Sequence, residues 1–466
     1  MRILSASFLL LTACATAPKP AEAPTEAAQT GRQTLRYRVA DVPVIQVIDR
    51  SLPTARITWT FARGADAEAE GELGASSLLA SLMSRGAAGK SAMEMAEAAE
   101  KLGASVHGNA NRDSMSFHAT GLSRDIAAIS ALLADTVRRP NLDPAEFERL
   151  KRQTLAGLKS SRNRGASLAQ RAFQRLLYGD DRLGLPVGGD EKTVAALTVD
   201  QLRALHGRAM HPGQLTVGVF GDVDPEQVKA LLSEQLSGWK SGAATAASKA
   251  ASIKPRARIH IVDKPDLTQV NIVLGHGGIA RNRADYEAIT LLNYALGGGG
   301  FSSRLMKLIR SEKGLTYGVR SAFSAGARPG PFMITTFTRV DRVRELIDLA
   351  FAVVDEVAKN GITEQELADA KGYYLGSYPL SLETVEGEGD RLLLAQRYGL
   401  GDDYVTAYPK HIAAVTGEQV KALAAELLRR EELVIVLAGP KDKLMDAVKD
   451  LGAVEASWWE DDRPLP

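Results

Sequence analysis

Two side chains with donor chemistry, Arg310 and Tyr317, lie seven residues apart on either side of a glycine. A guanidinium that is always charged and a phenolic hydroxyl can both donate hydrogen bonds. Aimed at one peptide carbonyl, they would hold the peptide and stabilise negative charge on its oxygen. One such donor is typically worth about 2.7–4 kcal/mol in a transition state. The alternative is that Arg310 is a solvated charge favoured by the end of a helix and that Tyr317 fills space on a sheet.

The surrounding pattern predicts the elements that position this pair. The glycine run Gly297–Gly300 gives the backbone freedom, and residues 301–312 have the spacing of an amphipathic helix. Its inward residues are Leu305, Leu308 and Ile309. Gly314 occupies the position where a left-handed residue ends a helix, and residues 315–319 are expected to form a strand. Arg310 near the helix end and Tyr317 on the strand can then converge.

This block resembles the arginine–tyrosine pair in the C-terminal half of pitrilysin/insulinase-type zinc peptidases, and the resemblance covers roughly residues 35–455. It implies that Arg310 and Tyr317 bind a substrate peptide in a chamber between two halves. In such peptidases a helix of the first half carries an H-x-x-E-H motif. Its two imidazoles hold zinc, and its carboxylate activates the bound water.

The corresponding context here, residues 74–83, lacks those groups. Ser77 and Ser81 stand where the histidines belong, and Ala80 stands where the glutamate belongs. Residues 155–158, where a further ligand is expected, contain no carboxylate. Neutral hydroxyls are poor zinc ligands beside imidazole. We therefore expect no metal, no cofactor and no catalytic residue in this chain, with zinc carried by a partner subunit.

The histidines offer no other metal site. His206 and His211 are five residues apart with Pro212 following, and His107 and His118 fall in predicted strands, so each is expected to be an ordinary histidine. By resemblance, residues 103–110 match the edge strand that receives extended peptide through backbone hydrogen bonds. His107 stands there in place of the family's usual asparagine, which makes it a third candidate for substrate binding.

One motif resembles a phosphate-binding loop, in residues 86–91. Ser84 occupies the position of the glycine that such a loop requires first, and the segment follows a helix rather than a strand. Ser91 with Glu94 is better explained as a helix cap. Nucleotide binding is not expected.

An internal repeat defines the architecture. Residues 198–205 resemble 416–423, and the same offset of 218 carries 215–221 onto 433–439. Residues 142–147 also resemble 362–367, and the helix starts in these repeats carry capping-box residues. The expected fold class is α+β, with two homologous halves that form a clamshell-like pair. Each half is a mostly antiparallel sheet with helices on one face.

Composition and segment boundaries complete this interpretation. The chain has 466 residues, 45% hydrophobic and 24% charged, with net charge +1, which fits a soluble globular protein and gives no reason to expect nucleic acid. The expected segments are a lipoprotein signal peptide (1–14), a flexible tether (15–32), an N-terminal peptidase-like domain (33–242), a linker (243–256) and a C-terminal peptidase-like domain (257–460). The alternative for the linker is a short alanine-rich helix.

The first residues predict a lipid anchor. Arg2 precedes a short apolar run, and residues 11–14 resemble a bacterial lipobox that ends at Cys14, the single cysteine of the chain. Cys14 is therefore the predicted lipidation site, unless it is a chance cysteine in an ordinary signal peptide. A chain with one cysteine forms no internal disulfide. The tether could reach roughly 60 Å at about 3.3 Å per residue.

Two hypotheses of different classes follow. The first is a non-catalytic, substrate-binding subunit that pairs with a zinc-motif peptidase subunit and acts on peptides at the periplasmic side of a bacterial membrane, with the outer membrane favoured. The second is a scaffold or assembly lipoprotein with a peptidase-like fold and no part in proteolysis. An autonomous peptidase with another metal site has no residues to support it.

Overall fold

The computed structural model describes residues 31–242, 253 and 258–465. The signal peptide with Cys14, nearly all of the tether and most of the linker 243–256 lie outside the described residues, so those predictions remain untested. Within the described part, no helix is both long and apolar enough to cross a membrane.

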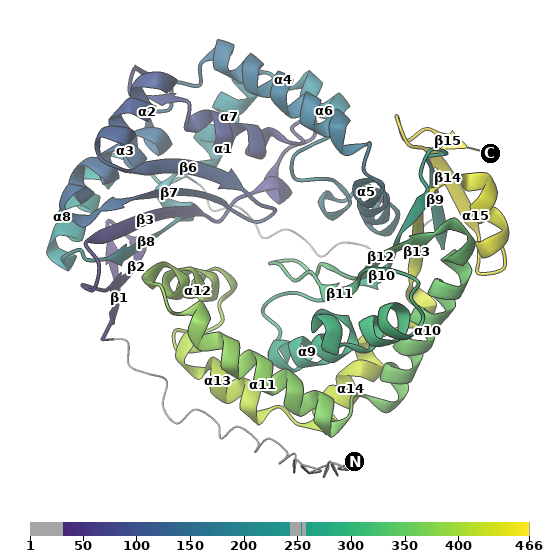
Figure 1. Cartoon of the computed structure of the whole chain (residues 1–466). Coiled ribbons are helices and arrows are strands. Elements are labelled where there is room, and N and C mark those ends of the chain that lie inside the picture. Colours follow the sequence, from purple (N-terminus) through teal and green to yellow (C-terminus); the bar gives the residue numbers. More distant parts are fainter. Residues whose placement is uncertain (1–30, 243–252, 254–257, 466) are drawn as a thin grey trace, which may run out of the picture. The chain divides into compact units, whose positions relative to one another are not determined.

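Each half contains one mixed sheet, shown in Figure 1. In the first half the strands run in the spatial order β1-β2-β8-β3-β7-β6. Their bounds are β1 (Gln33–Val39), β2 (Val42–Ile48), β3 (Thr54–Phe61), β6 (Ser105–Ala110), β7 (Met115–Leu122) and β8 (Leu215–Gly221). Only β2 and β8 pair in parallel among these strands, so the sheet is mostly antiparallel, as predicted.

The second sheet follows the order β11-β12-β10-β13-β9-β14-β15. Its strands are β9 (Ile259–Asp263), β10 (Gln269–Gly277), β11 (Val319–Phe323), β12 (Pro331–Arg339), β13 (Val434–Gly439), β14 (Val454–Trp458) and β15 (Pro464–Leu465). Here β9 pairs in parallel with both β13 and β14. The α+β class with two sheet-and-helix halves is confirmed.

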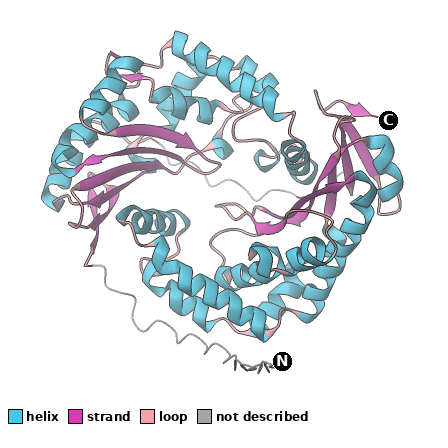
Figure 2. Ribbon diagram, viewed as in Figure 1, coloured by secondary structure: helices cyan, strands magenta, loops and turns pink. Residues whose placement is uncertain are grey.

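Helices account for most of the remaining chain (Figure 2). The first half contains α1 (Ala75–Met83), α2 (Ala92–Lys101), α3 (Ile126–Arg138), α4 (Pro144–Ser161), α5 (Gly165–Tyr178), α6 (Glu191–Ala196), α7 (Val199–Ala209) and α8 (Pro225–Leu236). The second half contains α9 (Tyr286–Asn293), α10 (Val343–Asn360), α11 (Glu364–Ser381), α12 (Val385–Tyr398), α13 (Tyr404–Ala414), α14 (Gly417–Leu427) and α15 (Lys441–Val448). Two π-helical segments, η5 (Tyr294–Gly298) and η7 (Met306–Glu312), flank the 3-10 turn η6 (Gly300–Ser302).

The repeated helix starts form as the repeat predicts. Helices α7 and α14 both begin with a complete capping box, from Thr198 and Thr416 respectively. Helix α11 begins with the box of Thr363. In α4 only half of the box forms, because Glu146 bonds to Arg149 at 2.7 Å instead of reaching back to the cap.

Each sheet is covered on both faces, which the prediction of helices on one face did not include. Helix α5 of the first half packs on the second sheet, where its Phe173 joins a buried cluster with Val273 and Val436. Helix α12 of the second half packs on the first sheet, where Gly389 lies against the ring of Phe220. The physical reason is that β8 and β13 are buried along nearly their whole length, so both of their faces require apolar cover.

Candidate peptide-binding site

Helix α1 carries the three residues that stand at the zinc-motif positions. Ser77 is half-buried and its hydroxyl donates to the Val187 carbonyl at 3.2 Å. Ser81 is exposed, and its hydroxyl donates to the Ser77 carbonyl one turn earlier, at 3.0 Å. The methyl group of Ala80 is fully buried.

A buried glutamate that sequence reasoning missed holds the start of this helix. The Glu68 carboxylate accepts hydrogen bonds from the backbone N–H groups of Gly74, at 3.1 Å, and Ser76, at 2.7 Å. An anion at this place is favoured by the helix dipole. Burial nevertheless raises the pKa of Glu68, against the lowering effect of those backbone bonds. Its only sequence signal is an acidic residue just before the helix, which is too common to single out.

These residues do not fit a zinc ion. Both serine hydroxyls already donate to carbonyl oxygens, and a methyl group stands where a carboxylate would be needed. Across residues 31–242, 253 and 258–465, no three histidine, cysteine, aspartate or glutamate side chains gather in a way that could hold a metal. No chemical step through a metal can therefore be derived from the side chains of α1.

Strand β6 lies at the edge of the first sheet, as predicted for residues 103–110. The backbone N–H of Asn111 donates to the Ser114 carbonyl at 2.8 Å, so these two residues form a hydrogen-bonded pair of the antiparallel β6–β7 ladder. Along such a ladder, pairs that are hydrogen-bonded to each other alternate with pairs that are not. Residues Ser105, His107 and Asn109 therefore turn their backbone groups toward β7. The backbone groups of Val106, Gly108 and Ala110 point outward, and within the described residues nothing bonds to them.

Helix α1 packs closely on β6 because one glycine leaves room for it. A Cβ added at Gly108 would come within 2.9 Å of the Ala80 carbonyl and 2.6 Å of the Phe117 ring. The structure thus brings Ala80 of α1 next to Gly108 on the open strand β6.

His107 is exposed on β6, and its ring lies 5.3 Å from that of His118, directly opposite on β7. His118 bonds through Nδ1 to the Thr58 hydroxyl at 3.0 Å. Burial lowers the pKa of His118 to about 4, with Arg56 adding to the effect. A neutral His118 therefore lies beside His107, on the strand next to β6.

Arg310 and Tyr317 lie on segments that differ from the predicted ones. The helix expected over 301–312 is interrupted at Ser303, whose hydroxyl donates to the Gly300 carbonyl at 2.7 Å, and it continues as the π-helix η7. Leu305 and Ile309 are fully buried and Leu308 is half-buried, as the spacing predicts. π-Helical turns are rare and often occur at functional sites.

The strand expected at 315–319 is wrong, because β11 begins only at Val319. The Thr316 hydroxyl takes part in a local turn, donating to the Gly318 carbonyl at 3.1 Å and accepting from its N–H at 3.2 Å. Tyr317 therefore precedes the strand and is 78% exposed. The Arg310 guanidinium lies over the Phe301 ring, 4.4 Å from its centroid. In the described structure, no bond or ring contact joins Arg310 or Tyr317 to α1 or β6.

The edge of the second sheet is occupied by its own half. The side-chain amide of Asn293 donates to the Ser321 carbonyl of β11 at 3.2 Å and accepts from the Ser321 hydroxyl at 2.8 Å. The Val319 N–H points to the Met306 sulfur at 3.4 Å. Gly297 permits this approach, since a Cβ there would lie 2.6 Å from the Ser321 nitrogen. These outward backbone groups are therefore already engaged.

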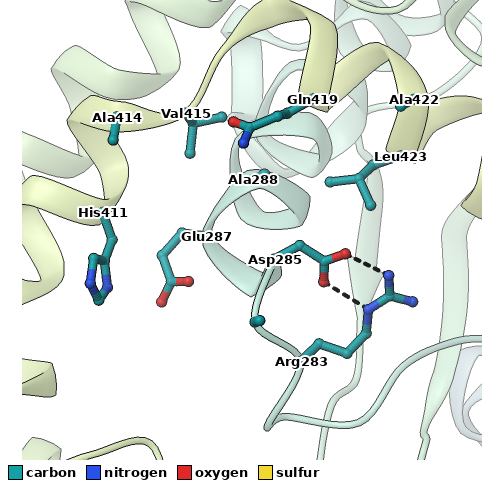
Figure 3. A pocket seen from close by; sticks show the side chains of 11 residues that line it. Arg283, Asp285, Glu287, Ala288, His411, Ala414, Val415, Gln419, Ala422 and Leu423 are labelled. Atoms are coloured by element: carbon teal, nitrogen blue, oxygen red, sulfur yellow. Dashed lines mark hydrogen bonds and ion pairs between the residues drawn. The ribbon is translucent and has the colours of Figure 1, made fainter.

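A separate pocket of about 760 Å³ lies in the second half, among α9, α13 and α14 (Figure 3). The Arg283–Asp285 ion pair forms one side, with contacts at 2.6 and 2.7 Å. Hydrogen bonding to Arg283 lowers the pKa of Asp285. None of the residues predicted for the site lines this pocket.

Together, the fold and the site define a two-half peptidase-like chain whose expected metal-binding helix has no metal ligands. Residues 44–191 match the family described as insulinase (peptidase family M16), and residues 196–373 match the peptidase M16 inactive domain. The chain belongs to peptidase family M16.

Individual relatives agree with this membership. An uncharacterized zinc protease of Mycobacterium leprae is 30% identical over 410 residues, covering 85% of this chain and 90% of that protein. A non-peptidase homolog of Helicobacter pylori is 26% identical over 356 residues, covering 74% and 80%. The crystal structure of a peptidase M16 inactive domain from Pseudomonas fluorescens has a TM-score of 0.83 and 30% identity, covering 88% of this chain and 98% of that one.

Proposed function

We propose that this chain is the non-catalytic, peptide-binding subunit of a two-chain zinc peptidase. The catalytic zinc would be carried by a partner subunit with an H-x-x-E-H helix. The observation that carries the proposal is the pairing of an open strand edge, β6, with an adjacent helix whose zinc-motif positions hold Ser77, Ala80 and Ser81.

The chemistry proposed for the open edge is strand addition. Val106, Gly108 and Ala110 offer outward N–H and C=O groups to an extended peptide, which supply affinity without requiring a particular sequence. His107 faces outward from the sheet beside that edge and would contact a substrate side chain. Arg310 and Tyr317 would donate to substrate carbonyl groups, for which the exposed Tyr317 hydroxyl is available without rearrangement.

The proposed location is the periplasmic side of a bacterial membrane, with attachment through lipid on Cys14. This part is supported by the lipobox-like residues 11–14 alone. Mass spectrometry of the mature protein purified from membranes tests it directly. An N-terminal diacylated cysteine is expected, and an unmodified Cys14 within the mature chain would contradict it.

The activity test mixes this chain with an H-x-x-E-H member of the same family from the same organism and follows cleavage of an unstructured fluorogenic peptide. Neither chain alone should cleave at the rate of the mixture. Ala110→Pro removes one outward N–H at an edge position that tolerates proline, and we expect about a tenfold loss of kcat/KM, equivalent to roughly one backbone hydrogen bond. Ala110→Ser keeps the N–H and is the matched control.

A second pair of variants tests the donors. Arg310→Ala and Tyr317→Phe should each lower kcat/KM of the mixture by about tenfold to a hundredfold, within the range for one lost donor to a developing charge. If the mixture cleaves peptide and its rate is unchanged by Ala110→Pro, Arg310→Ala and Tyr317→Phe, the chain is a scaffold rather than a substrate-binding subunit. A stoichiometric, tightly held zinc in the purified chain would contradict the non-catalytic assignment.

A further inference from the structure

Two histidines stand directly opposite each other on the β6–β7 hairpin of the first sheet. His107 on β6 pairs with His118 on β7, and residues that face each other across antiparallel strands have Cβ atoms about 4.5–5.5 Å apart. The next pair, Gly108 and Phe117, lies on the face of the sheet that packs against α1. Because side chains alternate along a strand, the two imidazoles lie on the opposite face, away from the residues at the zinc-motif positions.

The spacing of the two rings suits one metal ion between them. Their centroids are 5.3 Å apart, and their planes are inclined by 34°. An ion bound to one nitrogen of each ring at about 2.0–2.1 Å, with a tetrahedral angle at the metal, would hold the centroids about 5 Å apart. The ring of His107 is exposed and has no hydrogen bond in the described structure, so it has room to turn toward such an ion.

His118 is already oriented as a metal ligand. A hydrogen bond of 3.0 Å joins its Nδ1 to the Thr58 hydroxyl. When Nδ1 carries the proton and donates it to Thr58, Nε2 keeps its lone pair, and metal-binding histidines are usually held through their second nitrogen in this way. Within the described residues, Nε2 has no hydrogen-bond partner and keeps contact with solvent, so an ion can reach it.

The charges around the pair do not exclude a cation. The nearby cations are Arg56 and Arg397, and each has a carboxylate partner. Arg56 forms an ion pair with Asp390, and Arg397 Nη1 lies 3.7 Å from Asp113 Oδ1. Burial is the main cause that lowers the pKa of His118 to about 4, so at neutral pH no proton competes with a metal for its imidazole.

The chemistry of the ligands specifies the class of ion. Two imidazoles suit borderline ions such as Cu²⁺, Ni²⁺ and Zn²⁺, and Cu²⁺ binds such ligands most strongly. Across residues 31–242, 253 and 258–465, no third histidine, cysteine or carboxylate joins the pair to complete a metal-binding cluster. Water would therefore occupy the remaining positions, and the affinity should be lower than that of a closed structural site.

We propose that His107 and His118 form a two-imidazole site for a divalent transition-metal ion, Cu²⁺ above all, which would clip the open strand β6 to β7. The sequence-based expectation of two ordinary histidines did not include this site, because only the strand register places them opposite each other. The proposal goes beyond the proposed subunit role and does not depend on it, since it uses neither α1, Arg310, Tyr317 nor a partner chain.

Titration of the chelator-treated full chain with Cu²⁺, followed by electron paramagnetic resonance, tests the proposal. We expect binding in roughly the micromolar range with the hyperfine signature of two imidazole nitrogens, and affinity at least about tenfold weaker in His107→Asn and in His118→Asn. His411→Asn changes an exposed histidine of α13 and is the matched control, in which the affinity should not change.

His107→Asn is the decisive variant because the residue is exposed and its replacement should leave the fold intact, which circular dichroism checks. Equal affinity in His107→Asn and the native protein, or a spectrum with fewer than two imidazole nitrogens on the copper, would overturn the proposal. A chelator should remove the ion completely. This property separates the site from the tightly held zinc that would contradict the non-catalytic assignment, so failure of either proposal can be recognised by itself.

Discussion

The outermost strands β6 and β11 occupy equivalent edges of the two sheets, yet their free sides differ. On β11, Asn293 bonds to Ser321 and the Met306 sulfur lies at the Val319 N–H. On β6, the outward backbone groups of Val106, Gly108 and Ala110 have no partner in the described part of the chain. The repeat therefore reproduces the fold but not the capacity to accept another strand.

Unpaired edges are a liability that proteins normally cover. The second half covers its edge with one asparagine and a close-packed π-helical segment, and the first half brings α1 near β6 without covering the strand's outer side. For the proposed function, this contrast favours strand addition at the edge of the first half over the edge of the second.

The largest expected difference between the two edges is in how the stability of the protein near each edge depends on pH. On β7, the strand paired with β6, His118 has a folded pKa of about 4 against an ordinary 6.5, mainly through burial. The unfolded chain therefore takes up this proton first, so stability is lost as the pH falls from about 6.5 toward 4 and is unaffected above that range. The loss should reach about 2–4 kcal/mol. On β12, opposite β11, no residue in the paired register is a histidine.

Denaturant unfolding at pH 7 and pH 4.5 measures this effect in the native protein and in His118→Gln. The variant should lose less stability on acidification than the native protein does. Four other histidines, His206, His211, His260 and His276, also have lowered pKa values, and they contribute equally to both proteins. An identical acid sensitivity would show that His118 is not buried as a neutral group.

The next effect concerns how closely α1 approaches β6. Gly108→Ala places a methyl group against the Phe117 ring and the Ala80 carbonyl, and we expect a loss of about 1–3 kcal/mol from overpacking. Gly157→Ala, in the interior of α4 with nothing within 4 Å of the added carbon, is the control and should stabilise the protein by up to about 1 kcal/mol. Equal effects of the two substitutions would mean that α1 does not pack on β6 as described.

A smaller effect on stability is expected when the side chain that covers the β11 edge is removed. Asn293→Ala removes both hydrogen bonds to Ser321 and should cost about 1–2 kcal/mol in the free energy of unfolding. Asn360→Ala, at the end of α10, removes one exposed bond of 3.4 Å and should change stability by less than about 0.5 kcal/mol. A neutral Asn293→Ala would mean that this asparagine does not secure the β11 edge.

Local patterns and the repeat predicted much of the fold, for physical reasons that are visible in particular residues. Thr198 and Thr416 begin matching helices because capping is a contact between residues three apart. The strand predicted at Tyr317 failed because a single threonine, Thr316, bonds within its own turn. Hydrophobic periodicity does not show whether a side chain will bond within its own turn and so prevent the strand from starting there.

Long-range contacts could not be predicted in this way. Asp113 and Tyr398 are 285 residues apart in the sequence and meet only because α12 crosses to the first sheet. The same applies to Arg328 and Asp181, which are 147 residues apart in the sequence and form an ion pair between the two halves. Of the candidate site, the sequence predicted the edge strand β6 and a helix at Ser77–Ser81, and both form; it missed Glu68 and Asn293.

The most direct test is amide hydrogen exchange over Ser105–Ala110 and Val319–Phe323, measured with and without a saturating unstructured peptide. We expect the peptide to protect the outward amides of Val106, Gly108 and Ala110 while exchange in β11 stays unchanged. Protection confined to β11, or no protection of β6 at a peptide concentration that demonstrably binds, would contradict strand addition at the first-half edge.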